Sequence, residues 1–548
     1  MEIQTMKKLE EEALKKSGTD FTRLGFALFF MIAVLTFSFL SNGGIPNNMF
    51  LAVAALIGAY MAMNIGANDV ANNVGPAVGS KALTLTSAII IAAVFEAAGA
   101  LIAGGEVVKT IKKGIIDINA FGGNVDPFIW AMMAALLAAA LWLNFATMMR
   151  APVSTTHSIV GGVMGAGIAA AGFSIVDWGT MAKIAASWVI SPVLGGVIAA
   201  AFLFSIKKSI VFKDDKVQAA KKYVPIFVAL MSWAFVTYLT LKGLKKIWPQ
   251  IIEFLNMIPF VAMEMSKKPS FMTALILGFI IAIIVYILVK IKLQNNDTKL
   301  ENTKDSVNTL FTIPLIFAAA LLSFAHGAND VANAIGPLAA INDAVVNGGI
   351  SSSASIPLWV MGVGALGIAL GLALYGPKLI KTVGSEITDL DQIRAFSIAM
   401  AASITVIIAS QLGLPVSSTH IAIGGVFGVG FLREYLHLSD ANATIEEDRL
   451  TIKDEKENLH AYHNELKKLE SKTNKDSIEY ERVVELYKLI ALEEKNIKST
   501  KKHIKQSKKV EYVKRDAIKK IITAWIVTVP AAAVLAAILF YMIKGIML

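Results

Sequence analysis

The stretch that decides the fold occurs twice. Residues 66–76 read GANDVANNVGP, and residues 327–337 read GANDVANAIGP. A second stretch follows each copy at similar spacing, PVSTTH at 152–157 and PVSSTH at 415–420, and a pair of glycines comes soon after each. Two matched motifs in the same order indicate that the chain contains two homologous halves. A weaker match links Lys183, Trp188 and Pro192 with Lys520, Trp525 and Pro530, and it adds the last apolar segment to the second half.

The composition is that of a membrane protein. Of the 548 residues, 55% are hydrophobic and only 17% are charged. Apolar runs of about 20 residues, long enough to cross a bilayer, recur along the chain and predict an all-α polytopic protein with about 12 to 13 spanning or re-entrant helices. The run that begins at Leu24 has full length and no cleavage site, so we interpret it as an uncleaved transmembrane helix. The absence of cysteine excludes disulfides, thiolate metal sites and cysteine catalysis.

The positive charge lies in loops rather than on a compact basic fold. Lysines crowd the loops at 207–222 and 290–304, which predicts that both loops are cytoplasmic and argues against nucleic-acid binding. From these anchors the N-terminus is cytoplasmic and the C-terminus extracytoplasmic, although five lysines in the 242–268 loop oppose this orientation. An odd number of crossings separates the two motif copies, so we expect inverted-topology repeats, the architecture of secondary transporters.

The repeats divide the chain into six predicted segments. Residues 434–516 are densely charged with heptad-like leucines, which predicts a cytoplasmic, coiled-coil-like helical hairpin that serves for self-association, for partner binding or as a spacer. The segments are an N-terminal segment with an extra transmembrane helix (1–48), repeat 1 (49–206), a linker with two transmembrane helices (207–306), the core of repeat 2 (307–433), the helical insertion (434–516) and the last transmembrane helix (517–548).

Each signature motif carries an acid inside an apolar run. Asp69 and Asp330 precede Gly-Pro pairs, which predicts an unwound stretch of helix whose freed carbonyls line a cavity. Carboxylate, amide and carbonyl oxygens suit a hard cation. An intramembrane charge costs about 2.5–3.5 kcal/mol on insertion scales, which favours cation coordination or proton coupling over an unpaired structural role. Asn72 and Asn333 fit either this site or helix–helix hydrogen bonds.

Glu96 is a third acid within an apolar run, and no charged residue lies near it in sequence. It therefore needs a partner, an aqueous cavity or a proton, which favours a functional role.

The second motif of each half resembles the start of a helix. Proline and hydroxyl residues precede glycine-spaced apolar runs, so each box is expected to cap a half-helix. Free N–H groups and the positive end of the helix dipole make such a terminus a site for anions. Two facing boxes could hold one tetrahedral oxyanion.

His157 and His420 follow the boxes, and we interpret them as structural residues. The same interpretation applies to Arg150 and Lys81, which lie where membrane interfaces normally carry snorkelling cations. Close helix packing is expected at Gly161, Gly162, Gly165 and Gly167.

Together, the duplicated motifs resemble those of the inorganic phosphate transporter (PiT) family. The resemblance covers about residues 49–206, 307–433 and the final helix, and it implies sodium-coupled uptake of phosphate without an enzymatic activity or an organic cofactor. It implies that Glu96 takes part in coupling and that no transition-metal site is present. The implied phosphate-binding residues are Ser154, Thr155, Thr156, Ser417, Ser418 and Thr419, and the candidate sodium-binding residues are Asn68, Asp69, Asn72, Asn329, Asp330 and Asn333.

Several alternatives stay open at the level of sequence. Many eukaryotic relatives carry a further buried glutamate before the second box, but residues 395–411 contain none, so the coupling stoichiometry stays open. Coupling to protons in place of sodium is also an alternative. Sulfate has the same tetrahedral shape as phosphate, but only monohydrogen phosphate can donate a hydrogen bond to a nearby acid. An anion channel, a membrane sensor and an intramembrane protease fit the duplicated acids less well than a transporter does. Small-residue helices and the hairpin would also allow a homodimer.

Overall fold

The computed structural model describes the backbone of residues 2–122, 124–149, 153–257, 266–295, 300–349, 356–386, 390–472, 474, 476–507, 512–513 and 515–548. The described residues are helical apart from turns and one isolated bridge between Ile116 and Val176. Eleven helices among them are long and apolar enough to cross a membrane, in agreement with the predicted all-α polytopic membrane protein. Pro152, Arg150 and Lys299 lie outside the described residues.

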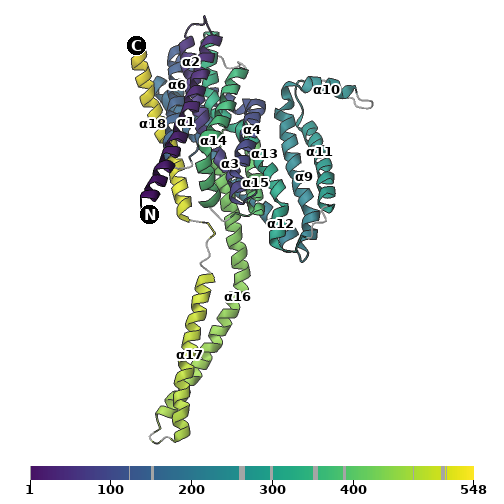
Figure 1. The fold of residues 1–548 in the computed structure, drawn as a ribbon, viewed down its shortest axis with the longest axis vertical. Coiled ribbons are helices and arrows are strands. Elements are labelled where there is room, and N and C mark those ends of the chain that lie inside the picture. Colours follow the sequence, from purple (N-terminus) through teal and green to yellow (C-terminus); the bar gives the residue numbers. More distant parts are fainter. Residues whose placement is uncertain are drawn as a thin grey trace. The chain divides into compact units, whose positions relative to one another are not determined.

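The chain forms two compact units, one of residues 1–429 with 515–548 and the other of residues 430–514. Helices α9 and α11 pack on each other at the edge of the first unit (Figure 1). The helices of the first unit are α1 (Glu2–Ser41), α2 (Asn48–Asn68), α3 (Val70–Gly79), α4 (Leu85–Ala103), α5 (Gly105–Lys113), α6 (Val125–Met148), α7 (Thr155–Ala171), α8 (Trp178–Ile206), α9 (Lys216–Lys242), α10 (Trp248–Asn256), α11 (Phe271–Gln294), α12 (Lys304–Leu310), α13 (Thr312–Asn347), α14 (Leu358–Glu386), α15 (Gln392–Gln411), the start of α16 (Ser418–Glu470) and α18 (Arg515–Met547).

Capping residues set where several of these helices begin. The side chains of Thr84, Asp177, Ser270 and Asp391 each accept a hydrogen bond from a backbone N–H in the first turn of α4, α8, α11 and α15, respectively. Such a cap satisfies one of the N–H groups that a helix start leaves unpaired.

Glycines bring matched helix pairs of the two halves into close contact. A Cβ atom on Gly66 of α2 would lie 1.9 Å from the carbonyl oxygen of Ile368 in α14, and one on Gly327 of α13 would lie 2.2 Å from that of Glu96 in α4. Likewise, Gly161 meets Val529 of α18, and its counterpart Gly424 meets Pro192 of α8. The second pair shows that the start of each box helix packs against the last helix of the other half. The inverted orientation of the halves stays a prediction.

The four glycines of α7 pack closely, as predicted from the sequence. Gly161 and Gly165 meet the backbone of α18, while Gly162 meets Ala135 and Gly167 meets Ile116. Replacing any of them with a larger residue would force neighbouring atoms apart.

The second unit is a helical hairpin made of the remainder of α16 and of α17 (Ser477–Ser507). Leu466, Leu486 and Ile490 form its buried core. Arg482 Nε and Nη2 donate to the two carboxylate oxygens of Glu465 at 2.9 and 3.1 Å, which fixes the pairing of the helices. Coiled-coil packing and the cytoplasmic location of the hairpin stay predictions.

Candidate functional site

The two signature motifs remain largely helical, which corrects the predicted unwinding. Asp69 separates α2 from α3, but its backbone stays in the right-handed helical region, and α13 continues through the second motif with Pro337 inside it. The physical reason is that a bilayer offers no water to freed backbone groups, so keeping the helical hydrogen bonds costs less than breaking them. Side chains therefore supply most of the polar atoms of the site.

The two hydroxyl boxes start helices, as predicted. Ser154 Oγ accepts from the N–H of His157 at 3.1 Å, and Ser417 Oγ accepts from the N–H of His420 at 3.3 Å. These serines therefore act as N-caps of α7 and α16. Their contact with phosphate stays a prediction.

Acids from the two halves meet at the start of α7. Thr155 Oγ1 lies 2.6 Å from Asp69 Oδ2 and 3.1 Å from Asp330 Oδ2, so one hydroxyl group stands between the two acids. Thr419, from the other box, donates to Asp69 Oδ1 at 2.8 Å. Each of these side chains is at most 1% exposed. The structure thus brings both acids and both boxes into one buried cluster.

The motif asparagines tie the boxes to the acids. Asn72 Nδ2 donates to Thr419 Oγ1 at 2.9 Å, and Asn333 Nδ2 lies 3.1 Å from both Thr155 Oγ1 and Thr156 Oγ1. Thr156 in turn donates to the carbonyl of Val416 in the other box. The amides of these asparagines therefore join helices, and their binding of sodium stays a prediction.

Asn68 and Asn329 occupy equivalent places one turn away. Asn68 Nδ2 donates to Thr147 of α6, and Asn329 Nδ2 donates to Ser410 of α15, both at 2.9 Å. Thr147 and Ser410 each lie five residues before the proline of their box, so sequence spacing could have indicated both. The matched contacts extend the likeness of the two halves beyond the motifs.

Glu96 finds the partner that its burial requires. Its Oε2 lies 2.7 Å from His326 Nδ1, and its Oε1 accepts from Asn73 at 2.8 Å. The other ring nitrogen of His326 lies 3.3 Å from Asp330 Oδ2, so the histidine joins Glu96 to the acid cluster. Sequence reasoning missed His326 and Asn73. The available signal was a polar residue directly before the second motif, where the first motif has Ile65.

Several buried oxygen atoms of the cluster are available for a cation. Asp330 Oδ1 and the amide oxygens of Asn72, Asn329 and Asn333 accept no hydrogen bond from any residue that the structure describes. Ligand atoms of Asp69, His326 and Asp330 also lie within 4.8 Å of one another. Hard cations prefer such carboxylate and amide oxygens. The donor set therefore fits sodium.

His157 and His420 pack with aromatic residues, in keeping with a structural role. Their ring centroids lie 4.5 Å apart. The ring of His157 lies 3.9 Å from that of Trp188 in α8, and the ring of His420 lies 3.5 Å from that of Trp525 in α18. The two histidines therefore have equivalent aromatic neighbours in the two halves.

Comparisons with known proteins agree with one another. A family model described as the phosphate transporter family matches residues 65–536. A relative from Helicobacter pylori strain J99, described as a candidate phosphate permease, is 50% identical over 98% of each chain. One from Thermococcus kodakarensis with the same description is 38% identical over 70% of this chain and 89% of its own. A solved structure entitled the sodium-dependent phosphate transporter is similar with a TM-score of 0.68 at 29% identity, covering 91% of this chain and 99% of that one.

Proposed function

The chain belongs to the phosphate transporter family, and from this premise we propose that it imports inorganic phosphate together with sodium by alternating access. The observation that carries the proposal is the meeting of Asp69 and Asp330 at hydroxyls of the two boxes. One site thus combines acceptor oxygens for a cation with hydroxyls and a helix N-terminus for an anion.

The geometry offers a physical basis for coupling. Thr155 and Thr419, two of the proposed phosphate ligands, donate to Asp69. A phosphate anion would meet the negative charge of the acids at these same hydroxyls. It therefore binds well only when cations neutralise that charge, and this links the two cargoes.

A count of buried charges supports more than one cation. Asp69, Glu96 and Asp330 carry up to three negative charges, and His326 can offset only one of them. The remaining charge is costly inside a membrane, so binding of sodium is favoured before binding of the anion.

Proton coupling is the second candidate, and the observation that favours it is the His326 bridge between Glu96 and Asp330. A histidine in contact with two acids can accept a proton in place of a metal cation. Sulfate is disfavoured as cargo because it cannot donate a hydrogen bond to the acids at neutral pH.

Radiolabelled phosphate uptake into proteoliposomes with an imposed sodium gradient tests the proposal. We expect accumulation by the wild-type chain, unaffected by excess sulfate and abolished in Asp330→Asn. Asp305→Asn, an exposed acid at the start of α12, is the matched control and should transport normally. Accumulation driven only by a proton gradient would replace sodium by protons, and displacement by sulfate would refute phosphate as the cargo.

A further inference from the structure

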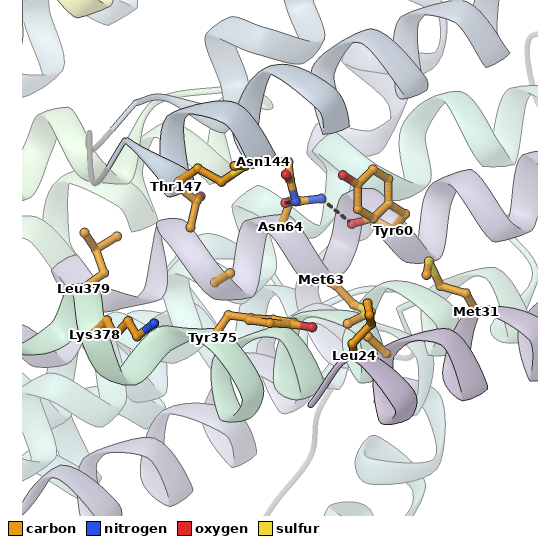
Figure 2. Close-up of a pocket in the computed structure, with 13 residues that line it drawn as sticks. Leu24, Met31, Tyr60, Met63, Asn64, Asn144, Thr147, Tyr375, Lys378 and Leu379 are labelled. Atoms are coloured by element: carbon orange, nitrogen blue, oxygen red, sulfur yellow. Dashed lines mark hydrogen bonds between the residues drawn. The ribbon is translucent and has the colours of Figure 1, made fainter. Parts of the chain in front are cut away.

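A pocket lined by both apolar and polar side chains adjoins the candidate site. It has a volume of about 520 Å³ and lies between α1, α2, α6 and α14. Figure 2 shows Tyr60 and Asn64 of α2, Asn144 of α6, and Tyr375 and Lys378 of α14 around it. Lys378 is the charged residue among those that line it, and its amine offers N–H donors to an anion.

The pocket shares a wall with the site. Thr147 lines the pocket and also accepts the hydrogen bond from Asn68, the neighbour of Asp69. Ala67, the preceding residue, lines it too. One layer of side chains thus separates the pocket from the acid cluster.

The matching place in the other half is filled. Aligning the motifs and the glycine contacts matches Met63 with Phe324, Ala67 with Ala328, and Tyr375 with Ala103. Phe324, Ala328 and Ala103 belong to one hydrophobic cluster, which Tyr238 completes. Ile407, the counterpart of Asn144, packs against this cluster.

Ion pairs occupy the position that corresponds to Lys378 in the other half. The counterpart of Lys378 is Glu106 of α5, whose carboxylate lies 3.1 Å from Lys245 and 3.9 Å from Lys242. The acid thus joins α5 to the end of α9 and to the turn that follows it. Where one half has a pocket with a lysine, the other has a hydrophobic cluster covered by ion pairs.

We propose that the pocket is a second phosphate-binding site, at which the anion is held between the central site and one face of the membrane. The hydrophobic cluster is the corresponding path in its closed form. This inference rests on the proposed function. Lys378 supplies the charge, while the hydroxyls of Tyr60 and Tyr375 and the amide of Asn144 supply hydrogen-bond donors. A phospholipid headgroup offers the same phosphate chemistry, so the test must separate the two sources.

The absence of native cysteine allows a direct test on the full chain. Tyr375→Cys places a thiol in the pocket, and Ala103→Cys places one at the matched position of the cluster. We expect the anionic reagent 2-sulfonatoethyl methanethiosulfonate to label the first variant at least about tenfold faster than the second, because only the first thiol can ionise and meet reagent in an aqueous space. Inorganic phosphate should slow labelling of Tyr375→Cys. Equal rates in the two variants would overturn the proposal.

Lys378→Gln tests the charge without a change at Tyr375. It should raise the apparent KM for phosphate uptake about threefold or more, the size expected from loss of a nearby unit charge in a partly solvated site. Lys544→Gln, an exposed lysine in the last turn of α18, is the matched control and should leave the KM unchanged. An unchanged KM in Lys378→Gln would refute the assigned role.

Two comparisons separate the sources of phosphate and the two proposals. If labelling of Tyr375→Cys slows on transfer from detergent to phospholipid vesicles and phosphate has no further effect, the pocket holds a lipid and the proposal is wrong. Sodium-driven uptake by the wild-type chain without phosphate protection of the pocket thiol would overturn this inference alone. Protection without uptake would support the pocket and refute the proposed transport.

Discussion

Gly327 offers a sharp test of how closely α13 and α4 must approach. In Gly327→Ala, the new Cβ would lie 2.2 Å from the carbonyl oxygen of Glu96. Ordinary contact requires the helices to separate by about 1 Å, and overpacking of this kind typically costs about 1–3 kcal/mol. Because Glu96 binds His326 from the same turn, the displacement also disturbs the acid cluster. We expect a lower melting temperature and a fall in phosphate uptake of about tenfold or more, since misplacement by 1 Å can cost a functional site up to about 100-fold.

The assay combines thermal unfolding of the purified protein in detergent with uptake into proteoliposomes. The matched control is Gly362→Ala in α14, where a Cβ meets no atom within 4 Å. That variant should gain helix propensity of about 1 kcal/mol and transport normally. Wild-type melting and uptake in Gly327→Ala would refute the reasoning, because the helices would then tolerate separation.

Four further predictions follow from individual contacts. His326→Gln removes the base that joins Glu96 to Asp330, so sodium-driven uptake should fall at least about tenfold while the elution volume of the purified protein stays unchanged. Asn329→Ala deletes a candidate sodium ligand, and a sodium titration at saturating phosphate should show a raised KM for sodium. Leu486→Asp places a charge in the hairpin core, so proteolysis of residues 430–514 should accelerate without loss of uptake, whereas lost uptake would show that transport requires the folded hairpin. Hydrogen bonds from Arg482 lower the pKa of Glu465, so this pair stabilises the hairpin above the ordinary glutamate pKa and ceases to do so as the pH falls through the lowered value. Hydrogen exchange in Arg482→Ala should therefore exceed that of the wild type at pH 7, and the difference should vanish in acid.

The sequence predicted the parts of the site that are duplicated. Asp69 and Asp330 could be assigned to one cluster because each stands at the same place in a repeated motif. The capping of α7 and α16 also followed from local patterns, since a helix start depends on the few residues around it. Repetition supplied information about distant contacts that a single motif does not contain.

The parts that escaped prediction include contacts made by residues that the repeated motifs do not contain. Burial of Glu96 required a partner, but no local pattern connects residue 96 with His326 across 230 positions. The predicted unwinding of the motifs failed because the tendencies of glycine and proline are weaker than the need to satisfy backbone groups in a bilayer. Tyr238 comes from a helix outside both repeats, so the motifs could not indicate that it would complete the hydrophobic cluster.

The difference between the halves bears on the energetics of transport. The glycine contacts match Glu96 with Ile368, and the repeated motif matches His326 with Ile65. If the halves exchange conformations, as proposed, a charged contact occupies one conformation where an apolar contact occupies the other. Breaking a buried ion pair costs about 3–5 kcal/mol unless another charge replaces the lost partner. The two conformations therefore differ in free energy before any cargo binds, and a cation that binds beside Asp330 changes this difference directly. Under the proposed exchange of conformations, the contact between Glu96 and His326 is therefore an asymmetry that the duplicated acids of the motifs do not share.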